Sequence, residues 1–312
     1  MKYGFGIDLG GTTVKLAYFD QNGNMLDKWE IPTNTAEDGK YILPDIAAAI
    51  LKYMEEKNIS KDQIIGAGIG VPGAVNNKGI VAGCDNLGWG HFNVKDALEP
   101  LLGMKVVAGN DATVAALGEC WKGGGQGYKS MVLVTLGTGV GGGIVLGGKP
   151  VHGSTGAAGE IGHMVINRNE TAVCGCGKSG CVEQYCSATG IARLARLVLA
   201  ESDAPSVLRD AEKIVAKDVF DAAKSGDKLA QEVLEQVYAY MGEFIANICC
   251  VMNPEIVVFG GGVSKAGQVL LDGVKKHFAK WGYHACQDTQ FALATLGNDA
   301  GAYGAFKLVV EE

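Results

Sequence analysis

Several features that would place this chain in a special class are missing from its 312 residues. No run of ~18 consecutive apolar residues occurs, so we expect no membrane-spanning helix. The stretch from Met1 to Asp8 lacks the apolar core of a signal peptide, so we expect the nine cysteines to stay reduced in the cytoplasm. An excess of basic residues is also absent. The formal net charge is −7, which argues against nucleic acid as a partner.

Glycine, by contrast, is abundant. The sequence contains 47 glycines, about twice the share found in an average globular protein. They cluster in tight turns after apolar strands, where the backbone can approach a ligand closely. At ~100–200 residues per domain, the length predicts two domains. The shares of apolar and charged residues, 47% and 20%, are ordinary and indicate a globular protein.

The segment from Glu160 to Glu183 contains a candidate metal site. Its possible ligands are His163, Cys174, Cys176 and Cys181. Three thiolates and one imidazole suit zinc, and four protein ligands leave no position for water, so such a zinc would be structural. The alternative is three reduced thiols in a glycine-rich loop. The flanking carboxylates of Glu160 and Glu183 are suited to accept hydrogen bonds from the hydroxyl groups of a small polar ligand.

The chain opens with a β-turn-β unit. Apolar residues alternate from Tyr3 to Leu9 and again from Val14 to Tyr18, with the turn Gly10-Gly11-Thr12-Thr13 between them. The turn offers backbone N–H groups, two hydroxyl groups and the nearby Lys15 ammonium, all of which suit phosphate oxygens. Asp8, close to the end of the first strand, suits a magnesium ion that is bound directly or through water. The alternative is an ordinary Gly-Gly hairpin.

A second unit of the same kind follows later in the chain. An apolar strand from Met131 to Leu136 leads into Gly137-Thr138-Gly139, and a returning strand covers Ile144 to Leu146. Two copies of one β-turn-β pattern predict a duplicated fold in which each turn binds phosphates. A third glycine turn, Gly260-Gly261, follows an apolar strand from Glu255 to Phe259 and offers bare backbone to a flat ring or a ribose.

Asp111 is a candidate catalytic carboxylate. It lies where a strand, predicted from Met104 to Ala108, leads into a helix, predicted from Val114 to Trp121. Ligands of open α/β sheets commonly bind at this end of a strand. The alternative for Asp111 is a structural role as the helix cap. Beyond the cysteine cluster the apolar spacing predicts mainly helices. They are expected over Ser187–Glu201, Val207–Ala223, Lys228–Met252 and about Asp299–Val310.

Taken in order, these motifs resemble those of the ROK family of sugar kinases and sugar-responsive repressors. The resemblance spans almost the whole chain. It rests on Asp8-x-Gly10-Gly11-Thr12, Asn110-Asp111, Leu136-Gly137-Thr138-Gly139, Glu160-x-x-His163, Cys174-x-Cys176-Gly177-x-x-Gly180-Cys181-x-Glu183 and Gly260-Gly261-Gly262. Within the family, the stretches Gly109–Gly125 and Ser187–Gly190 look most like those of bacterial glucokinases.

The resemblance implies an α/β fold of the actin-like ATPase type, with two related ribonuclease-H-like domains around a central cleft. We place the N-terminal domain at residues 1–115 and the larger C-terminal domain, with the zinc-binding segment, at residues 116–298. A final helix at about residues 299–312 is expected to pack back on the first domain. The resemblance also implies a sugar site. Its residues would be Gly73, Asn86, Asn110, Asp111, Glu160, His163 and Glu183, with one ring nitrogen of His163 for zinc and the other for sugar.

The reaction implied by the resemblance is transfer of the γ-phosphoryl group of ATP to the 6-hydroxyl group of glucose. Asp111 would act as the general base, and magnesium would neutralise charge on the phosphates. The cofactors would be ATP, Mg²⁺ and a structural Zn²⁺. Zinc would be held by His163, Cys174, Cys176 and Cys181. ATP would be bound by Asp8, Gly10, Gly11, Thr12, Thr13, Lys15, Gly137, Thr138, Gly139, Gly260 and Gly261.

Two alternatives stay open from the sequence. The substrate could be another hexose, namely N-acetylglucosamine, N-acetylmannosamine, fructose or allose, because the pocket around the sugar's 2-position is not readable. The chain could also be a sugar-responsive regulator without catalytic activity. Repressors of the family carry a DNA-binding helix-turn-helix before the first strand, which here is expected to begin at about Lys2. Family resemblance further suggests a homodimer or homotetramer.

Overall fold

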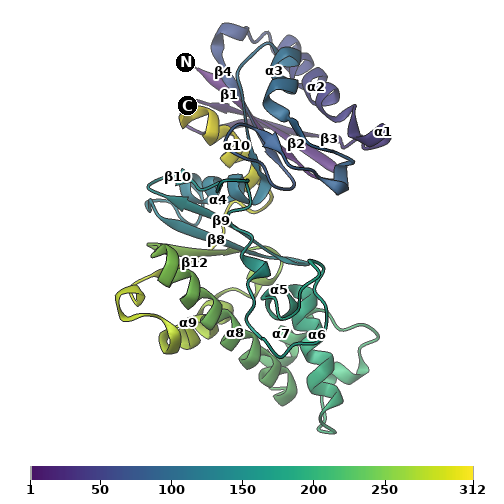
Figure 1. Ribbon diagram of the computed structural model, residues 1–312, viewed down its shortest axis with the longest axis vertical. Coiled ribbons are helices and arrows are strands. Elements are labelled where there is room, and N and C mark those ends of the chain that lie inside the picture. Colours follow the sequence, from purple (N-terminus) through teal and green to yellow (C-terminus); the bar gives the residue numbers. More distant parts are fainter. Residues whose placement is uncertain (1, 312) are drawn as a thin grey trace. The chain divides into compact units, whose positions relative to one another are not determined.

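The computed structural model describes residues 2–311, in which helices flank two five-stranded sheets (Figure 1). Two compact units divide these residues. The first contains residues up to 131, residues 143–159 and residues from 295 onward, and the second contains residues 132–142 and 160–294. The domain boundaries expected near residues 115 and 298 stay a prediction. Among the described residues, no helix has both the length and the apolar character that crossing a membrane requires.

The first sheet consists of β1 (Tyr3–Leu9), β2 (Thr13–Asp20), β3 (Met25–Pro32), β4 (Ile64–Val71) and β7 (Val106–Asn110). Its strand order is β3-β2-β1-β4-β7. The predicted β-turn-β unit is confirmed, because β1 pairs antiparallel with β2 and places Asp8 opposite Lys15. β4 pairs parallel with β1, and β7 pairs parallel with β4. The carboxyl ends of these three parallel strands therefore lie at one edge of the sheet.

The second sheet repeats this topology. It consists of β8 (Met131–Leu136), β9 (Val140–Leu146), β10 (Lys149–Pro150), β11 (Ile256–Gly260) and β12 (Gln290–Leu293). The order β10-β9-β8-β11-β12 again places the third, second, first, fourth and fifth strands side by side. The duplication predicted from the two β-turn-β units is thus confirmed. Two further strands, β5 (Ile80–Val81) and β6 (Phe92–Asn93), form a separate antiparallel ribbon.

Helices cover both faces of the first sheet. They are α2 (Ile42–Glu56), α3 (Val94–Leu102), α4 (Asp111–Lys122) and α10 (Ala300–Glu311), and the short α1 (Ala36–Gly39) precedes α2. α2 and α3 share one buried apolar cluster with β1 and β4. α10 packs on the opposite face, where the rings of Phe19 and Phe306 stack with centroids 4.8 Å apart. A Cβ atom at Gly68 would lie only 1.7 Å from the Ala305 carbonyl oxygen. Some glycines therefore lie inside strands, where they let a helix pack closely against the sheet, and not only in turns.

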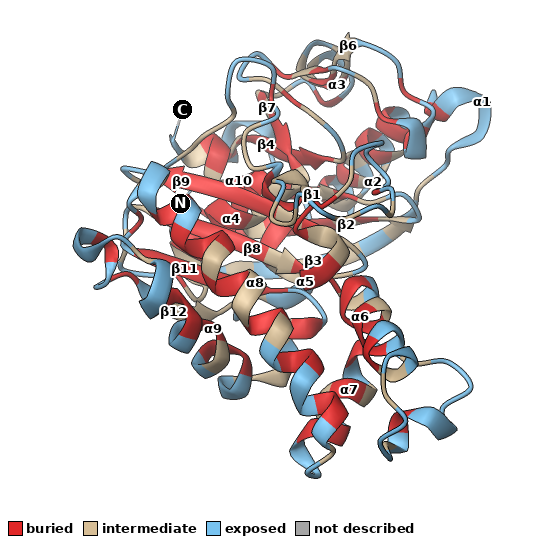
Figure 2. Ribbon diagram, turned by 60° about the horizontal axis from the view of Figure 1, so that its bottom comes forward, coloured by how far each residue is buried: buried red, intermediate tan, exposed pale blue. Residues whose placement is uncertain are grey.

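The second unit is mainly helical, as predicted. Its helices are α5 (Glu183–Cys186), α6 (Ala188–Ala200), α7 (Ala216–Lys224), α8 (Lys228–Met252) and α9 (Gln268–Trp281). The long helix α8 begins and ends where the sequence predicts, and it carries buried and exposed residues on different sides (Figure 2). Neither α9 nor β12 was expected from the sequence.

The helix predicted over Val207–Ala223 is wrong in its first half. Only a short 3-10 turn is present at Val207–Asp210, and α7 begins at Ala216. The Asp218 carboxylate accepts a hydrogen bond of 2.9 Å from the Val215 N–H, and this cap fixes the start of α7. Upstream, the Val207 N–H donates to the Asp227 carboxylate at 2.8 Å. Contacts with a residue far along the chain therefore compete with helix formation there.

Candidate functional site

The strand-to-helix junction at Asp111 forms as predicted, with β7 ending at Asn110 and α4 beginning at Asp111. The capping residue, however, is Asn110, whose Oδ1 accepts the Thr113 N–H at 2.9 Å. The alternative role of Asp111 as the helix cap is therefore wrong. Asn110 Nδ2 and the Ala112 N–H both donate to Asp111 Oδ1, at 2.9 and 2.7 Å. These two donors fix the direction of the Asp111 carboxylate.

The sugar-site residues predicted in the first unit lie close to this junction. Asn110 Nδ2 also donates to the Gly73 carbonyl at 2.9 Å, which joins the end of β4 to the end of β7. Asn86 is exposed on the short turn Asp85–Leu87. That turn adjoins Gly73, because a Cβ atom on Gly73 would lie 3.7 Å from Cys84 Cβ. The first unit thus holds Gly73, Asn86, Asn110 and Asp111, and the second holds Glu160, His163 and Glu183.

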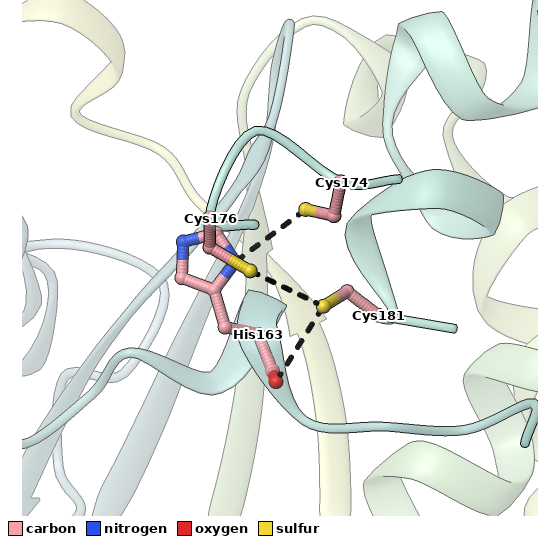
Figure 3. A group of neighbouring side chains, drawn as sticks. All are labelled: His163, Cys174, Cys176 and Cys181. Carbon is pink, nitrogen blue, oxygen red and sulfur yellow. Dashed lines mark hydrogen bonds between the residues drawn. The ribbon is translucent and has the colours of Figure 1, made fainter. Parts of the chain in front are cut away.

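The four predicted zinc ligands converge in the second unit, with their side chains pointing toward one another (Figure 3). One ligand atom from each of His163, Cys174, Cys176 and Cys181 lies within 4.8 Å of the others. The Sγ atoms of Cys176 and Cys181 are 3.6 Å apart, and His163 Nδ1 is 3.9 Å from Cys174 Sγ. Zinc–sulfur bonds of ~2.3 Å in a tetrahedron separate sulfur atoms by ~3.7 Å. Donor set and spacing therefore both fit zinc.

Burial and hydrogen bonding act on the three thiols in opposite directions. Burial raises the pKa of Cys174, and it raises the pKa of Cys181 to about 12. A hydrogen bond from the Lys178 backbone lowers the pKa of Cys176. Two of the three thiols would therefore be ionised at neutral pH only with a cation beside them, and a bound zinc ion supplies that charge. The backbone also has to turn sharply here: Gly180 has φ +79°, and a Cβ atom on it would lie 1.9 Å from the Asn167 carbonyl oxygen.

Glu183 lies between this cluster and the second phosphate-type turn. Its Oε1 is 3.7 Å from Cys174 Sγ, and its Oε2 accepts the Val140 N–H at 3.0 Å. A Cβ atom on Gly139 would lie 2.0 Å from the same Oε2, so a side chain there would displace the carboxylate. Glu160 is exposed and directly precedes the short turn Ile161–His163. The structure thus places Glu183 beside both the Gly137–Gly139 turn and the metal cluster to which His163 belongs.

An ion pair that the sequence did not reveal anchors the same segment. The Glu170 carboxylate accepts hydrogen bonds from Tyr185 Oη at 2.5 Å and from Arg193 Nη2 at 2.6 Å. Burial raises the pKa of Glu170, but the bonds from Tyr185, the Ala172 N–H and Arg193 outweigh it and lower the pKa to about 2. Arg193 lies 23 residues along the chain from Glu170, so no local motif signals the pair. It ties the segment before Cys174 to α5 and α6.

In the first phosphate-type turn, the Gly10 N–H donates to the Thr13 carbonyl at 3.1 Å. Lys15 Nζ lies 3.5 Å from Asp8 Oδ2 and 3.2 Å from the Asn298 carbonyl oxygen. Burial raises the pKa of Asp8, and the Lys15 ammonium opposes that shift. Asp8, which is predicted to bind magnesium, therefore forms an ion pair with Lys15, which is predicted to bind phosphate.

The third glycine turn borders a cavity. Gly261 has φ +83°, and a Cβ atom on it would lie 2.6 Å from the Leu136 carbonyl oxygen. Beside the turn is a cavity of about 360 Å³ with largely apolar walls, which include Ala188, Val215, Ala216, Phe220, Gly262 and Val263. No sequence motif marks Val215, Ala216 and Phe220, because they meet Gly262 and Val263 only in the fold. The apolar walls and the size suit a flat ring.

Comparisons with known proteins agree with these observations. The model of the ROK family matches residues 4–312. A glucokinase from Halalkalibacterium halodurans is 46% identical, over 98% of this chain and 94% of the relative. A glucokinase from Thermotoga maritima is 34% identical, over 98% of this chain and 96% of the relative.

A solved structure extends the comparison to the fold. The crystal structure of a ROK family glucokinase from Streptomyces griseus in complex with glucose and AMPPNP has a TM-score of 0.75 and 32% identity. The match covers 99% of this chain and 100% of that one. The actin-like ATPase fold expected from the sequence is thereby confirmed. Because the family model matches nearly its whole length, the chain belongs to the ROK family.

Proposed function

We propose that this protein is a glucokinase, which transfers the γ-phosphoryl group of ATP to the 6-hydroxyl group of glucose. The observation that carries the proposal is the Asp111 carboxylate, which Asn110 and Ala112 orient at a strand end. The proposal is also supported by the 46% identity of the chain to a glucokinase over almost its full length. A sensor can use the same carboxylate to bind a sugar hydroxyl group, so turnover is the observation that separates a kinase from a sensor.

Asp111 is the general base of the proposed reaction. It accepts the proton of the 6-hydroxyl group as that oxygen attacks the γ-phosphorus. A positioned base typically contributes ~10²–10⁴ in rate. Asn110 acts through Asp111, because its amide donates to Asp111 Oδ1 while its own oxygen caps α4. The rest of the acceleration comes from aligning the hydroxyl group with the phosphorus and from charge neutralisation.

Sugar and zinc share His163 in this proposal. His163 Nδ1 faces Cys174, which leaves Nε2 for a sugar hydroxyl group. The zinc ion has four protein ligands, so when bound it supplies structural order and no chemistry. Gly73, Asn86, Asn110, Asp111, Glu160 and Glu183 are the other proposed sugar contacts. Their carboxylate, amide and backbone groups suit the several hydroxyl groups of a hexose.

The proposed nucleotide contacts are the three glycine turns and the cavity beside the third. The turns Gly10–Thr13 and Gly137–Gly139 would bind phosphate oxygens through backbone N–H groups other than those of Gly10 and Gly137, which donate within their own turns. Lys15 adds a positive charge to the first turn, and Asp8 would hold magnesium, which neutralises charge on the phosphates. Gly260 and Gly261 border the apolar cavity, where the adenine ring would lie. The homodimeric or homotetrameric state and the cytoplasmic location stay predictions.

The test is glucose-dependent ADP release from MgATP, compared with N-acetylglucosamine, N-acetylmannosamine, fructose, mannose and allose. We expect the largest kcat/KM with glucose. Turnover mainly with an acetylated sugar would keep the kinase chemistry and overturn the substrate. Sugar binding by calorimetry without turnover on any sugar would overturn the enzyme assignment in favour of a sensor.

A further inference from the structure

We propose that two threonines, Thr33 and Thr189, are positioning residues that orient the phosphate-binding turns for ATP. The inference rests on the proposed function, in which the turns Gly10–Thr13 and Gly137–Gly139 bind phosphates. Each threonine contacts the carbonyl side of one turn. Neither belongs to the residues that the sequence predicts to touch a ligand.

In the second unit, the start of α6 holds two carbonyl groups of the turn. The Ala188 N–H donates to the Gly137 carbonyl at 2.8 Å, and Thr189 Oγ1 donates to the Thr138 carbonyl at 2.7 Å. Ser187 is the cap of α6, and its Oγ lies 3.0 Å from Thr189 Oγ1. The contact with the turn is therefore made by a helix end whose own geometry is fixed.

Holding the carbonyl groups also sets the direction of the N–H groups. In a planar trans peptide the C=O and N–H bonds point in opposite directions. With the carbonyls of Gly137 and Thr138 directed at α6, the N–H groups of Thr138 and Gly139 point away from it. Two neighbouring N–H groups that point the same way suit an anionic oxygen. The peptide between Gly139 and Val140 is held by its N–H group and not by its carbonyl, because the Val140 N–H donates to Glu183.

The first unit shows the same arrangement. Thr33 Oγ1 donates to the Gly10 carbonyl at 2.6 Å, and the Thr33 N–H donates to the Thr12 carbonyl at 2.9 Å. The N–H group of Gly11 therefore points away from Thr33. The Thr13 N–H lies on the side of β2 that faces Gly10, whose N–H donates to the Thr13 carbonyl at 3.1 Å.

Different elements supply the two contacts. Thr33 directly follows β3, whereas Thr189 lies in the first turn of α6. The repeated sheet topology therefore does not by itself produce both threonine contacts. A shared requirement, namely N–H groups directed at phosphate oxygens, explains why both turns are held by their carbonyls.

The experiment replaces each threonine by valine, which keeps the shape and removes the hydroxyl group. Serine at the same position is the matched control, because it restores the hydroxyl group. We expect Thr33→Val and Thr189→Val each to raise the KM for ATP by ~3–10-fold, the effect of one lost hydrogen bond. The KM for glucose should stay near that of the unchanged protein. Thr33→Ser and Thr189→Ser should bring the KM for ATP back toward its original value.

Calorimetry with two ligands separates orientation of the turns from damage to the nucleotide pocket. MgADP carries phosphates and should bind the valine variants more weakly by the same factor, whereas adenosine should bind them unchanged. An unchanged KM for ATP in both valine variants would overturn the proposal, as would a parallel loss of adenosine binding or a failure of serine to rescue. If the unchanged protein did not phosphorylate glucose, the proposed function would fail, yet the comparison of MgADP with adenosine would still test the threonines.

Discussion

At the scale of single residues, Asp111 carries the proposed chemistry, and its neighbours decide where its carboxylate points. Two donors hold Oδ1, and one of them is the side chain that caps α4. Helix geometry and base orientation are thus linked through Asn110. A substitution of Asn110 is expected to affect both, whereas a substitution of Asp111 leaves the capping side chain of α4 in place.

Replacing Asp111 by Asn keeps the size of the side chain and removes its ability to accept a proton. We expect turnover to fall at least ~10²-fold, with a smaller change in glucose affinity. The measurements are kcat from ADP release and the glucose Kd from calorimetry. Asp203→Asn, at an exposed loop position, is the control and should behave like the unchanged protein. Near-normal turnover of Asp111→Asn would remove Asp111 from the mechanism.

The lowered pKa of Glu170 predicts how the free energy of unfolding depends on pH. Its pKa is lowered from 4.5 in the unfolded chain to about 2 in the fold, so the folded state favours the ionised form. The stabilisation is therefore full above the unfolded value and is lost as the pH falls from about 4.5 through about 2. We expect Glu170→Gln to lower the free energy of unfolding by ~1–3 kcal/mol at neutral pH.

Urea unfolding at a series of pH values checks this expectation. The difference between Glu170→Gln and the unchanged protein should shrink as the solution is acidified below pH ~4.5. The exposed Glu212→Gln is the matched control and should show little difference at any pH. A difference that stayed constant down to acid pH would show that ionisation of Glu170 does not stabilise the fold.

At the scale of secondary-structure elements, the zinc segment links metal, sugar and phosphate residues within a short stretch of chain. Glu183 begins α5, approaches Cys174 through one oxygen and accepts the Val140 N–H with the other. Loosening the metal cluster should therefore disturb Glu183 and His163 together.

Cys176→Ser tests this link, because Cys176 is the exposed ligand and its loss opens the cluster with little change in packing. We expect the bound zinc, measured by mass spectrometry of metal content, to fall and the KM for glucose to rise. Cys250→Ser, at an exposed cysteine outside the cluster, is the control and should change neither. Loss of zinc with an unchanged KM for glucose would contradict the connection between metal and sugar.

Elements with strong local signals could be predicted from the sequence, and those set by distant partners could not. The 25 residues of α8 show continuous helical spacing, and the glycine turns follow clear strand patterns. The start of α7 depends on Asp218, which binds the Val215 N–H, and on Asp227, which binds the Val207 N–H from 20 residues along the chain. The Glu170–Arg193 ion pair likewise cannot be predicted from a local sequence pattern, because the two residues become neighbours only in the fold.

Among the site residues, the zinc ligands were predictable because their residue types and spacing are distinctive, and the structure brings them together. The capping role of Asn110 was not, because Asn and Asp are almost equally good caps and adjacent in the sequence. The threonines that contact the turns were missed for a different reason. Their hydroxyl groups bond to backbone carbonyls, which leave no trace in the sequence.

At the scale of the whole molecule, one strand order occurs twice, and the proposed ligand contacts recur at equivalent places in both copies. A phosphate-type turn follows the first strand of each sheet, at Gly10 and at Gly137. A glycine follows the fourth strand of each, at Gly73 and at Gly261. Asp111 follows the fifth strand of the first sheet. Strand ends of this kind are where α/β sheets bind ligands, so the duplication accounts for the repeated ligand turns.

Phosphorus NMR of a reaction containing the protein, MgATP and glucose distinguishes phosphorylation of the 6-hydroxyl group from every other fate of the γ-phosphoryl group. We expect ATP to be converted to equal amounts of ADP and glucose 6-phosphate, and Asp111→Asn to make almost none. ADP accompanied only by inorganic phosphate, phosphate on another hydroxyl group of glucose, or no loss of ATP would each contradict it.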